Sequence, residues 1–206
     1  MTTLLDNYKE YAQASLANYA KKDETSRYLL FNAVKDLRIE RVLDVGCGAG
    51  QDLLPFLEKT SAICVGIDTA TQLGQVTEEV FGDEERAMFV RSEGEKLPFK
   101  NESFDVVLCR VALPYMDNRE AIAEVARILK PNGIYLLKTH APYVYFEMIR
   151  NRVKTLNPKQ LVFPLVCVAG SLWHLITGKR LQNGLQIDGF LPDNSRVAQS
   201  YVVVKR

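Results

Sequence analysis

Short apolar runs alternate with amphipathic stretches through the middle of the chain. Each run is apolar on both faces and bounded by polar or glycine residues, which is typical of a buried strand. Apolar residues at helical spacing predict helices between these strands, over 52–58, 73–80 and 119–129. The alternation predicts an α/β protein built on a doubly wound, mostly parallel sheet. The predicted strands are 41–45, 62–68, 88–91, 104–109 and 134–137.

The two ends of the chain complete this plan. Residues 4–37 are polar with apolar positions at helical spacing, which predicts two or three short helices. Two further strands are expected at 185–191 and 201–205, and the short segment between them favours direct antiparallel pairing. The sheet is therefore expected to have seven strands. We expect one domain over 1–206, divided into an N-terminal helical cap (1–38), a core (39–140), an apolar helical insert (141–183) and the last two strands (184–206).

Composition narrows the class of protein. The chain has 206 residues, of which 47% are hydrophobic and 25% charged, close to the averages of globular domains. This balance excludes disordered, collagen-like and multi-span membrane proteins. The formal net charge of +1 gives no general attraction for nucleic acid, and none is expected as a partner.

The cysteines indicate neither a disulfide framework nor a metal site. Cys47, Cys64, Cys109 and Cys167 form no C-x-x-C pair and have no histidine at zinc-ligand spacing. We expect buried, reduced thiols in a cytoplasmic protein, and no bound metal. The first ten residues are polar, so no signal peptide is expected.

A glycine-rich loop follows the first predicted strand. Gly46, Gly48 and Gly50 have the spacing G-x-G-x-G, whereas a dinucleotide fingerprint would need glycine where Gln51 stands. Asp44, two residues before the first glycine, would repel a pyrophosphate but suits the ammonium group of an amino-acid-like ligand.

Asp68 ends the second predicted strand, where its carboxylate suits the two hydroxyls of a ribose. Each acidic residue also has an ordinary explanation. Asp44 could cap a helix, Asp68 could belong to a turn, and Glu93 could be one solvated carboxylate in an acidic stretch.

The order and spacing of these motifs resemble the class I S-adenosylmethionine-dependent methyltransferases, in particular the group that includes ubiquinone/menaquinone-biosynthesis enzymes. The resemblance covers about 41–138 and implies a Rossmann-like methyltransferase fold. Its motifs are VLDVGCGAG at 42–50, VGID at 65–68, EGEKLPF at 93–99 followed by SFDVV at 103–107, and ILKPNG at 128–133.

The resemblance implies S-adenosylmethionine as cofactor and S-adenosylhomocysteine as product. Asp68 would take the ribose hydroxyls, and Glu93 with the backbone of Gly94 would meet the adenine. The methionine part would be held by Asp44, Gly46, Gly48 and Gly50. Cys109 and Arg110, placed after the fourth strand, would pass near the sulfonium.

A general base is needed only if the acceptor must lose a proton. Many members of the family have a pair of histidines after the fourth strand, whereas this chain has Leu-Pro-Tyr-Met at 113–116. His140, expected just after the fifth strand, is either a catalytic base or a hydrogen-bonded loop histidine. Tyr115, Tyr143 and Tyr145 could line an aromatic pocket or simply pack in the core.

The insert at 141–183 is expected to choose the acceptor. Residues 160–178 contain no charged side chain, and basic residues flank them on both sides. One interpretation is a helical cap that lines an apolar substrate site. Others are a peripheral contact of 141–180 with anionic lipid, a buried core helix, or a homodimer surface. A membrane-spanning helix is not expected, because Pro164 and Gly170 interrupt the run and strands of one sheet lie on both sides of it.

The sequence thus predicts methyl transfer to a small, hydrophobic acceptor. A non-catalytic cofactor-binding partner or scaffold is the alternative. A nicotinamide-dependent oxidoreductase is a third class, which Gln51 disfavours.

Overall fold

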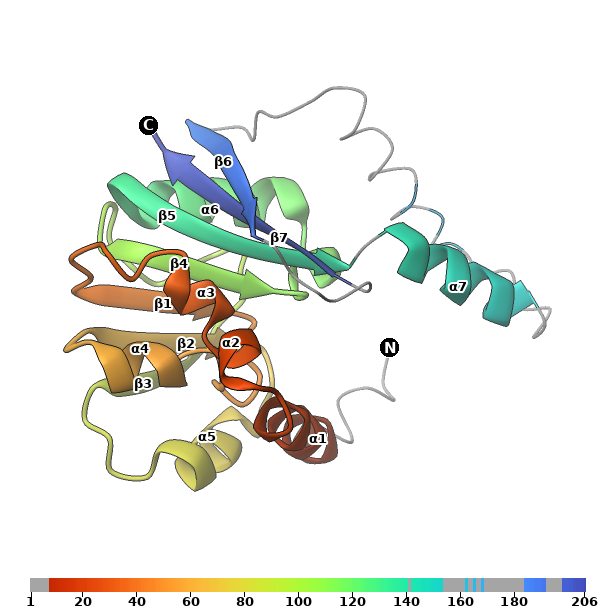
Figure 1. The fold of residues 1–206 in the computed structure, drawn as a ribbon, viewed down its shortest axis with the longest axis horizontal. Helices are drawn as coiled ribbons and strands as arrows, with labels where there is room; N and C mark the ends of the chain where they lie inside the picture. Colours follow the sequence, from red (N-terminus) through yellow and green to blue (C-terminus); the bar gives the residue numbers. More distant parts are fainter. Residues whose placement is uncertain are drawn as a thin grey trace.

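A seven-stranded sheet forms the centre of the molecule (Figure 1). The computed structural model describes residues 8–140, 142–153, 162, 165, 168, 184–191 and 198–206. The strand order is β3-β2-β1-β4-β5-β7-β6. The strands are β1 (Arg41–Val45), β2 (Ile63–Asp68), β3 (Ala87–Arg91), β4 (Phe104–Arg110), β5 (Leu129–His140), β6 (Leu185–Leu191) and β7 (Ala198–Lys205).

The first five strands are parallel, and β7 runs antiparallel to both of its neighbours, β5 and β6. The predicted doubly wound, mostly parallel sheet is confirmed. The chain order reverses between β1 and β4, because β1 pairs with β2 on one side and with β4 on the other. Ligands of such sheets bind beyond the carboxyl ends of the strands at this point.

Helices cover both faces of the sheet. The long ones are α1 (Tyr8–Ala20), α5 (Leu73–Phe81), α6 (Asn118–Ile128) and α7 (Pro142–Val153). The short ones are α2 (Glu24–Arg27), α3 (Leu29–Asn32), α4 (Leu54–Lys59) and the 3₁₀ helix η1 (Leu113–Tyr115). Asp117 caps α6 by accepting hydrogen bonds from the backbone N–H groups of Arg119 and Glu120.

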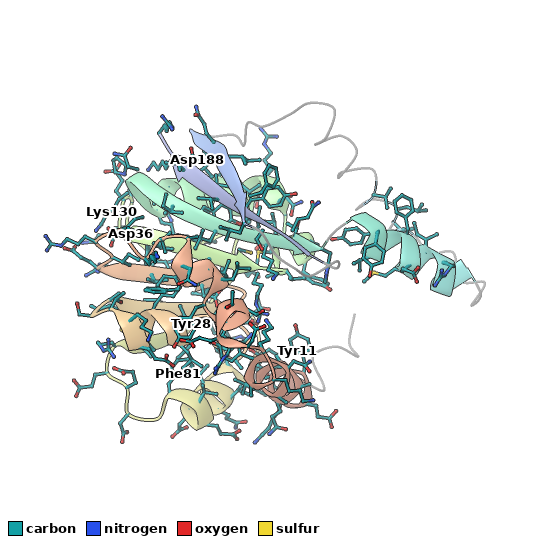
Figure 2. All side chains as sticks on the ribbon, in the orientation of Figure 1. Tyr11, Tyr28, Asp36, Phe81, Lys130 and Asp188 are labelled. Atoms are coloured by element: carbon teal, nitrogen blue, oxygen red, sulfur yellow. The ribbon has the colours of Figure 1, made fainter. Side chains whose placement is uncertain are left out.

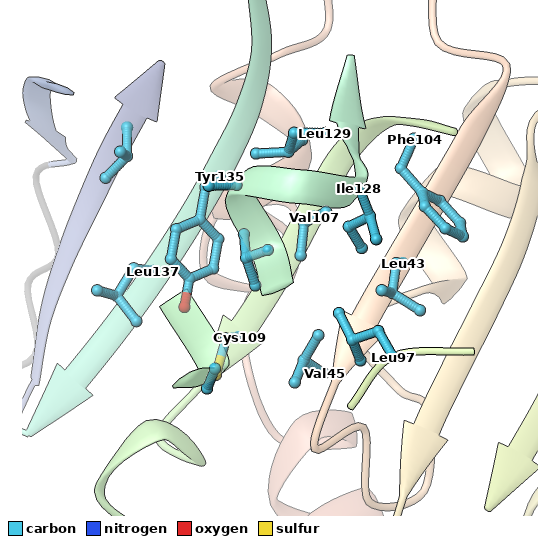
Figure 3. Packing of buried hydrophobic residues seen from close by; sticks show 14 of the residues in the cluster. Leu43, Val45, Leu97, Phe104, Val107, Cys109, Ile128, Leu129, Tyr135 and Leu137 are labelled. Atoms are coloured by element: carbon cyan, nitrogen blue, oxygen red, sulfur yellow. The ribbon is translucent and has the colours of Figure 1, made fainter. Parts of the chain in front are cut away.

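Side chains of β1 point alternately to the two faces of the sheet, and each face has its own apolar layer. Leu43 and Val45 pack with the buried face of α6 on one side of the sheet (Figure 3). Val42 points to the opposite side, toward residues of α3 and α4. Because side chains alternate along a strand, Asp44 lies on the same side as Val42. The carboxylate is therefore placed in the layer beneath the N-terminal helices.

The first helix closes over the loop that follows β1. Tyr8 and Ala12 of α1 pack with Ala49 of this loop and with Val76 of α5. The Tyr8 hydroxyl donates a hydrogen bond to the Gly48 carbonyl oxygen, with an O···O distance of 2.9 Å. The N-terminal segment thus reaches the glycine loop itself.

The structure corrects several predicted boundaries. The fifth strand begins at Leu129 and continues to His140, so His140 ends the strand rather than following it. The register between β4 and β5 shifts between Leu129 and Ile134, where Asn132 has a positive φ of 62°. Cys109 lies within β4 as the strand prediction had it, and Arg110 also belongs to β4, which ends one residue later than predicted.

Other predictions are tested only in part. Cys47, Cys64 and Cys109 are buried free thiols, as expected, and Cys167 lies outside the described residues. Of the insert at 141–183, the structure describes α7 and the single residues 162, 165 and 168. Helix α7 projects away from the sheet beyond the end of β5 (Figure 1). No helix within the described residues is both long and apolar enough to cross a membrane.

Candidate functional site

The residues singled out in the sequence lie along one edge of the sheet. Five parallel strands end there, in the spatial order β3, β2, β1, β4, β5. In that order they bring Gly94, Asp68, the glycine loop, Arg110 and His140 to the same edge. Asp44 lies one residue before the end of β1. The structure therefore gathers residues that are spread over almost 100 positions of the chain.

The glycine loop turns sharply where β1 ends. Gly46, Gly48 and Gly50 have φ angles of 73°, 56° and 77°, a region that side chains rarely adopt. The N–H groups of Gly46 and Cys47 both donate to the Ile67 carbonyl oxygen, each at 2.9 Å, which ties the loop to β2. A Cβ on Gly46 would lie 2.3 Å from the Cβ of Ala112, whereas one on Gly48 would meet no atom of the described residues within 4 Å. Within the described part of the chain, the space beside Gly48 is thus open.

Asp44 is a buried carboxylate at the base of this loop, with an exposed fraction of 1%. Neither carboxylate oxygen has a hydrogen-bond partner within the part of the chain that the structure describes. Burial, together with the nearby Asp52 carboxylate, raises the pKa of Asp44 well above its usual value, and Arg110 opposes this. A buried polar group without a partner is costly, so a donor is expected to satisfy it. Its predicted alternative role as a helix cap is not observed.

Asp52 and Arg110 form an ion pair next to Asp44. Asp52 lies just before α4, and Arg110 is the last residue of β4. The two side chains are 10% and 24% exposed, so the pair is largely shielded from water. The charge of Asp52 is the main reason that the pKa of Arg110 is raised.

Asp68 holds the glycine loop through its side chain. Its Oδ2 accepts a hydrogen bond from the Gly48 N–H at 3.0 Å, and its Oδ1 accepts one from the Ala70 N–H at 3.1 Å. The second contact is a local turn, as the simpler interpretation predicted. An ionised carboxylate accepts about four hydrogen bonds, so both oxygens can still accept from hydroxyl groups.

Glu93 and Gly94 follow β3. Glu93 is exposed and Gly94 is buried. A Cβ on Gly94 would lie 2.6 Å from the sulfur of Met116 and 3.2 Å from a methyl carbon of Val45. The backbone at Gly94 therefore has side chains packed directly against it, and a side chain at this position would force Met116 to move.

Cys109 has its side chain on the far side of the sheet from Asp44. Figure 3 shows the sulfur beside the Tyr135 hydroxyl, within the layer covered by α6. Burial raises the pKa of the Cys109 thiol to about 12, which makes it a packing residue rather than a nucleophile. Only the backbone of Cys109 is placed near the candidate site.

His140 packs edge-to-face against Tyr145 of α7, with ring centroids 6.0 Å apart. Tyr145 is buried, but Tyr115 and Tyr143 are 70% and 46% exposed. Core packing therefore explains Tyr145 and does not explain the other two tyrosines.

The site has the chemistry that an adenosyl amino acid requires. The Asp44 carboxylate, which has no partner among the described residues, suits a cationic ammonium group. No described atom would block a ligand that approaches the backbone at Gly48. Asp68 can accept from a ribose diol, and Gly94 provides a close-packed backbone wall next to Val45 and Met116. The residues present therefore fit S-adenosylmethionine, which Asp44, the glycine loop, Asp68 and Gly94 would hold.

Sequence reasoning missed Tyr8, Asp52 and Met116. Tyr8 and Asp52 reach the site through contacts between distant segments, namely the Gly48 carbonyl and the Arg110 side chain. No motif marks them, although Tyr8 is one of the apolar positions at helical spacing within 4–37. Met116 follows η1, at the place where the absent histidine pair drew attention.

Comparisons with known proteins agree with this geometry. Residues 43–137 match the family model described as a methyltransferase domain. An uncharacterized methyltransferase of Bacillus subtilis, YcgJ, is 38% identical over 103 residues, which are 48% of this chain and 40% of that protein. A sterol 4-C-methyltransferase of Caenorhabditis elegans is 30% identical over 99 residues, which are 46% of this chain and 29% of that protein.

A crystal structure of a TehB-like S-adenosylmethionine-dependent methyltransferase from Corynebacterium glutamicum has the same fold. Its TM-score is 0.65 at 17% identity, and the match covers 98% of this chain and 99% of that one. At this identity the likeness concerns the fold alone.

The fold and the site define a Rossmann-like α/β protein with a glycine-loop site at the switch point of its sheet. Over residues 43–137 the chain is similar to methyltransferase domains, and it shares its fold with an S-adenosylmethionine-dependent methyltransferase of known structure. The chain spans only 40%, 42% and 53% of the length of three of its curated relatives.

Proposed function

We propose that this protein transfers the methyl group of S-adenosylmethionine to a small, hydrophobic acceptor. The observation that supports this most directly is Asp44, a fully buried carboxylate without a hydrogen-bond partner among the described residues, at the base of a glycine loop. A purely structural fold has no reason to keep such a group uncompensated, because burying it is costly. A cationic ligand at this loop would compensate it.

Each part of the cofactor has a proposed partner. Asp44 and the glycine loop would hold the methionine part, Asp68 the ribose hydroxyls, and Glu93 with the backbone of Gly94 the adenine. The backbone of Cys109 and Arg110 would pass near the sulfonium. A carboxylate contact of this kind contributes about 1.5–3 kcal/mol.

The sulfonium supplies an already activated methyl group, so the protein's task is mainly to align and enclose the reactants. Tyr8 contributes by fixing α1 over the glycine loop through the Gly48 carbonyl. Met116 contributes by packing against Gly94, which leaves an apolar wall beside the site. Both residues exclude water from the donor side.

A hydrophobic acceptor is favoured by the apolar character of residues 160–178 and by the exposed Tyr143 and Phe146 of α7. Sterol methyltransferases among the relatives act on an apolar molecule, whereas another relative is a malonyl-[acyl-carrier protein] O-methyltransferase. We therefore propose that the core binds the cofactor and that the insert at 141–183 selects the acceptor.

The proposed division of the chain follows from these roles. Residues 1–38 would cap the cofactor, 39–140 bind it, and 184–206 complete the sheet of a single domain. The cytoplasmic location, the peripheral membrane contact, the homodimer and the ubiquinone/menaquinone grouping stay predictions.

A labelled-methyl assay tests transfer and acceptor class together. Purified protein is incubated with methyl-labelled S-adenosylmethionine and a small-molecule cell extract, and the label is partitioned between organic solvent and water. The proposal predicts label in the organic phase with the wild-type protein and none with D68A. Label confined to the aqueous phase would contradict a hydrophobic acceptor. No transfer despite intact cofactor binding would favour the non-catalytic alternative.

His140 is the proposed general base for an acceptor that must lose a proton. It ends β5 at the same sheet edge as the glycine loop, and Tyr145 fixes its ring from one side. We expect H140A to abolish turnover in the assay above while its affinity for S-adenosylhomocysteine stays near that of the wild type. Unchanged turnover would remove His140 from the mechanism.

A further inference from the structure

The ion pair between Asp52 and Arg110 lies on the same face of the sheet as Asp44. Asp44 pairs with Leu108 in the register of β1 and β4, and Arg110 is two residues further along β4. Because side chains alternate, Leu108 and Arg110 point to one face, which is the face of Asp44. Neighbouring strands are about 4.8 Å apart and two residues span about 6.6 Å, so an arginine side chain can reach Asp44.

Arg110 is nevertheless bound to Asp52 and not to Asp44. Its guanidinium contacts the Asp52 carboxylate, while both oxygens of Asp44 stay without a partner within the described segments. Asp52 therefore holds the cation close to Asp44 without letting it occupy the carboxylate. This arrangement leaves Asp44 open to a ligand.

The charges around Asp44 are unbalanced without Arg110. Asp52 lies before α4 and Asp68 ends β2, and both carboxylates disfavour the ionised form of Asp44. Cys47, in the loop, is a buried thiol that also interacts with Asp44. Among the described residues that shift the pKa of Asp44, only Arg110 is cationic.

We propose that Arg110 is a positioning residue that favours the ionised form of Asp44 without pairing with it, so that Asp44 can receive the ammonium group of the methyl donor. Asp52 serves this role by anchoring Arg110. The inference rests on the proposed donor site. It adds that the ion pair of Arg110 and Asp52 influences the charge of Asp44.

Two substitutions that break the same ion pair separate this role from a merely structural one. R110M removes the cation, so Asp44 should become protonated at higher pH than in the wild type. D52N removes a like charge and frees Arg110 to pair with Asp44, so Asp44 should stay ionised to lower pH. R110K keeps the charge and should remain close to the wild type. If the ion pair had a structural role alone, R110M and D52N would have the same phenotype.

The first measurement uses the ligand-free protein. A pH titration of the Asp44 carboxyl carbon by NMR should show its midpoint moving up in R110M and down in D52N. Shifts in the same direction, or no shift in either variant, would overturn the proposal. D52N has its own predicted direction, a downward shift of the Asp44 midpoint. The test therefore stays decisive even if R110M does not fold.

The second measurement is calorimetric titration with S-adenosylhomocysteine between pH 5 and 9. At pH values where Asp44 is protonated, the affinity for S-adenosylhomocysteine should fall about tenfold for each further unit by which the pH is lowered. That fall should begin at higher pH in R110M, and D52N should bind more weakly at neutral pH because Arg110 occupies Asp44. Superimposable profiles would refute the role in binding. Absence of any binding by the wild-type protein would instead refute the proposed function, while the NMR titration would still decide the charge of Asp44.

Discussion

At the scale of single residues, the three glycines of the loop have different reasons to be glycine. All have positive φ angles, but their surroundings differ. Gly46 lies against Ala112, and Gly50 lies against Phe81 and Phe89, where a Cβ would come within 2.8 Å of each ring. A Cβ on Gly48 would contact none of the described residues. Two of the glycines are therefore required by packing, whereas Gly48 is required by backbone conformation and by the space that we assign to the ligand.

Alanine at Gly46 and at Gly48 should separate these reasons. Both variants carry the strain of a left-handed conformation, about 1–2 kcal/mol. G46A also forces Ala112 aside, which adds about 1–3 kcal/mol of overpacking. We expect urea unfolding to show a distinctly larger loss of unfolding free energy in G46A. G48A should instead lose affinity for S-adenosylhomocysteine, because its methyl group enters the open space. Equal losses of stability in the two variants would contradict this account.

At the scale of elements, Asp105 joins three segments at the amino end of the sheet. Its Oδ2 accepts hydrogen bonds from the N–H groups of Glu40 and Arg41, at 3.0 and 2.9 Å, where β1 begins. Its Oδ1 contacts the Lys130 ammonium at 2.6 Å, near the start of β5. Partial burial opposes ionisation, but these contacts outweigh it and lower the pKa of Asp105.

The stability contributed by Asp105 should depend on pH with a definite sign. A carboxylate with a lowered pKa in the folded state stabilises the protein above its unfolded pKa of about 3.9, and this is lost as pH falls through the folded value. D105N should therefore lower the unfolding free energy by about 1–3 kcal/mol near neutral pH. The difference from the wild type should shrink below about pH 4. The exposed Asp36, labelled in Figure 2, provides a control in D36N, which should change little. A difference that grows toward acid pH would refute the assignment.

The sequence predicted elements well where local pattern determines them. The bounds of β1 and β6 agree with the apolar runs, and the glycine spacing marked the loop with positive φ angles. The end of β5 could not be predicted, because residues 138–140 are held by pairing with 198–200 of β7 rather than by an apolar run. The Asp52–Arg110 pair was missed for the same reason, since strand order brings together positions far apart in the chain.

At the scale of the whole molecule, one sheet edge holds every group assigned to the donor. Strand order places β1 at the switch point, and α1 covers the glycine loop through Tyr8. Tyr11 of the same helix is exposed and projects outward (Figure 2). The proposed acceptor side would be bounded by His140 and Tyr145, which pack together where α7 leaves the body of the sheet. Donor and acceptor would thus be bound by different elements of the fold.

Calorimetric titration with S-adenosylhomocysteine tests the central claim most directly, since it needs no knowledge of the acceptor. We expect the wild-type protein to bind, D44N to bind at least about tenfold more weakly through loss of a charged contact, and D36N to bind like the wild type. Nicotinamide dinucleotides should give no heat. A wild-type protein that gives no heat with S-adenosylhomocysteine at millimolar concentration, or a D44N variant that binds it equally well, would contradict the account.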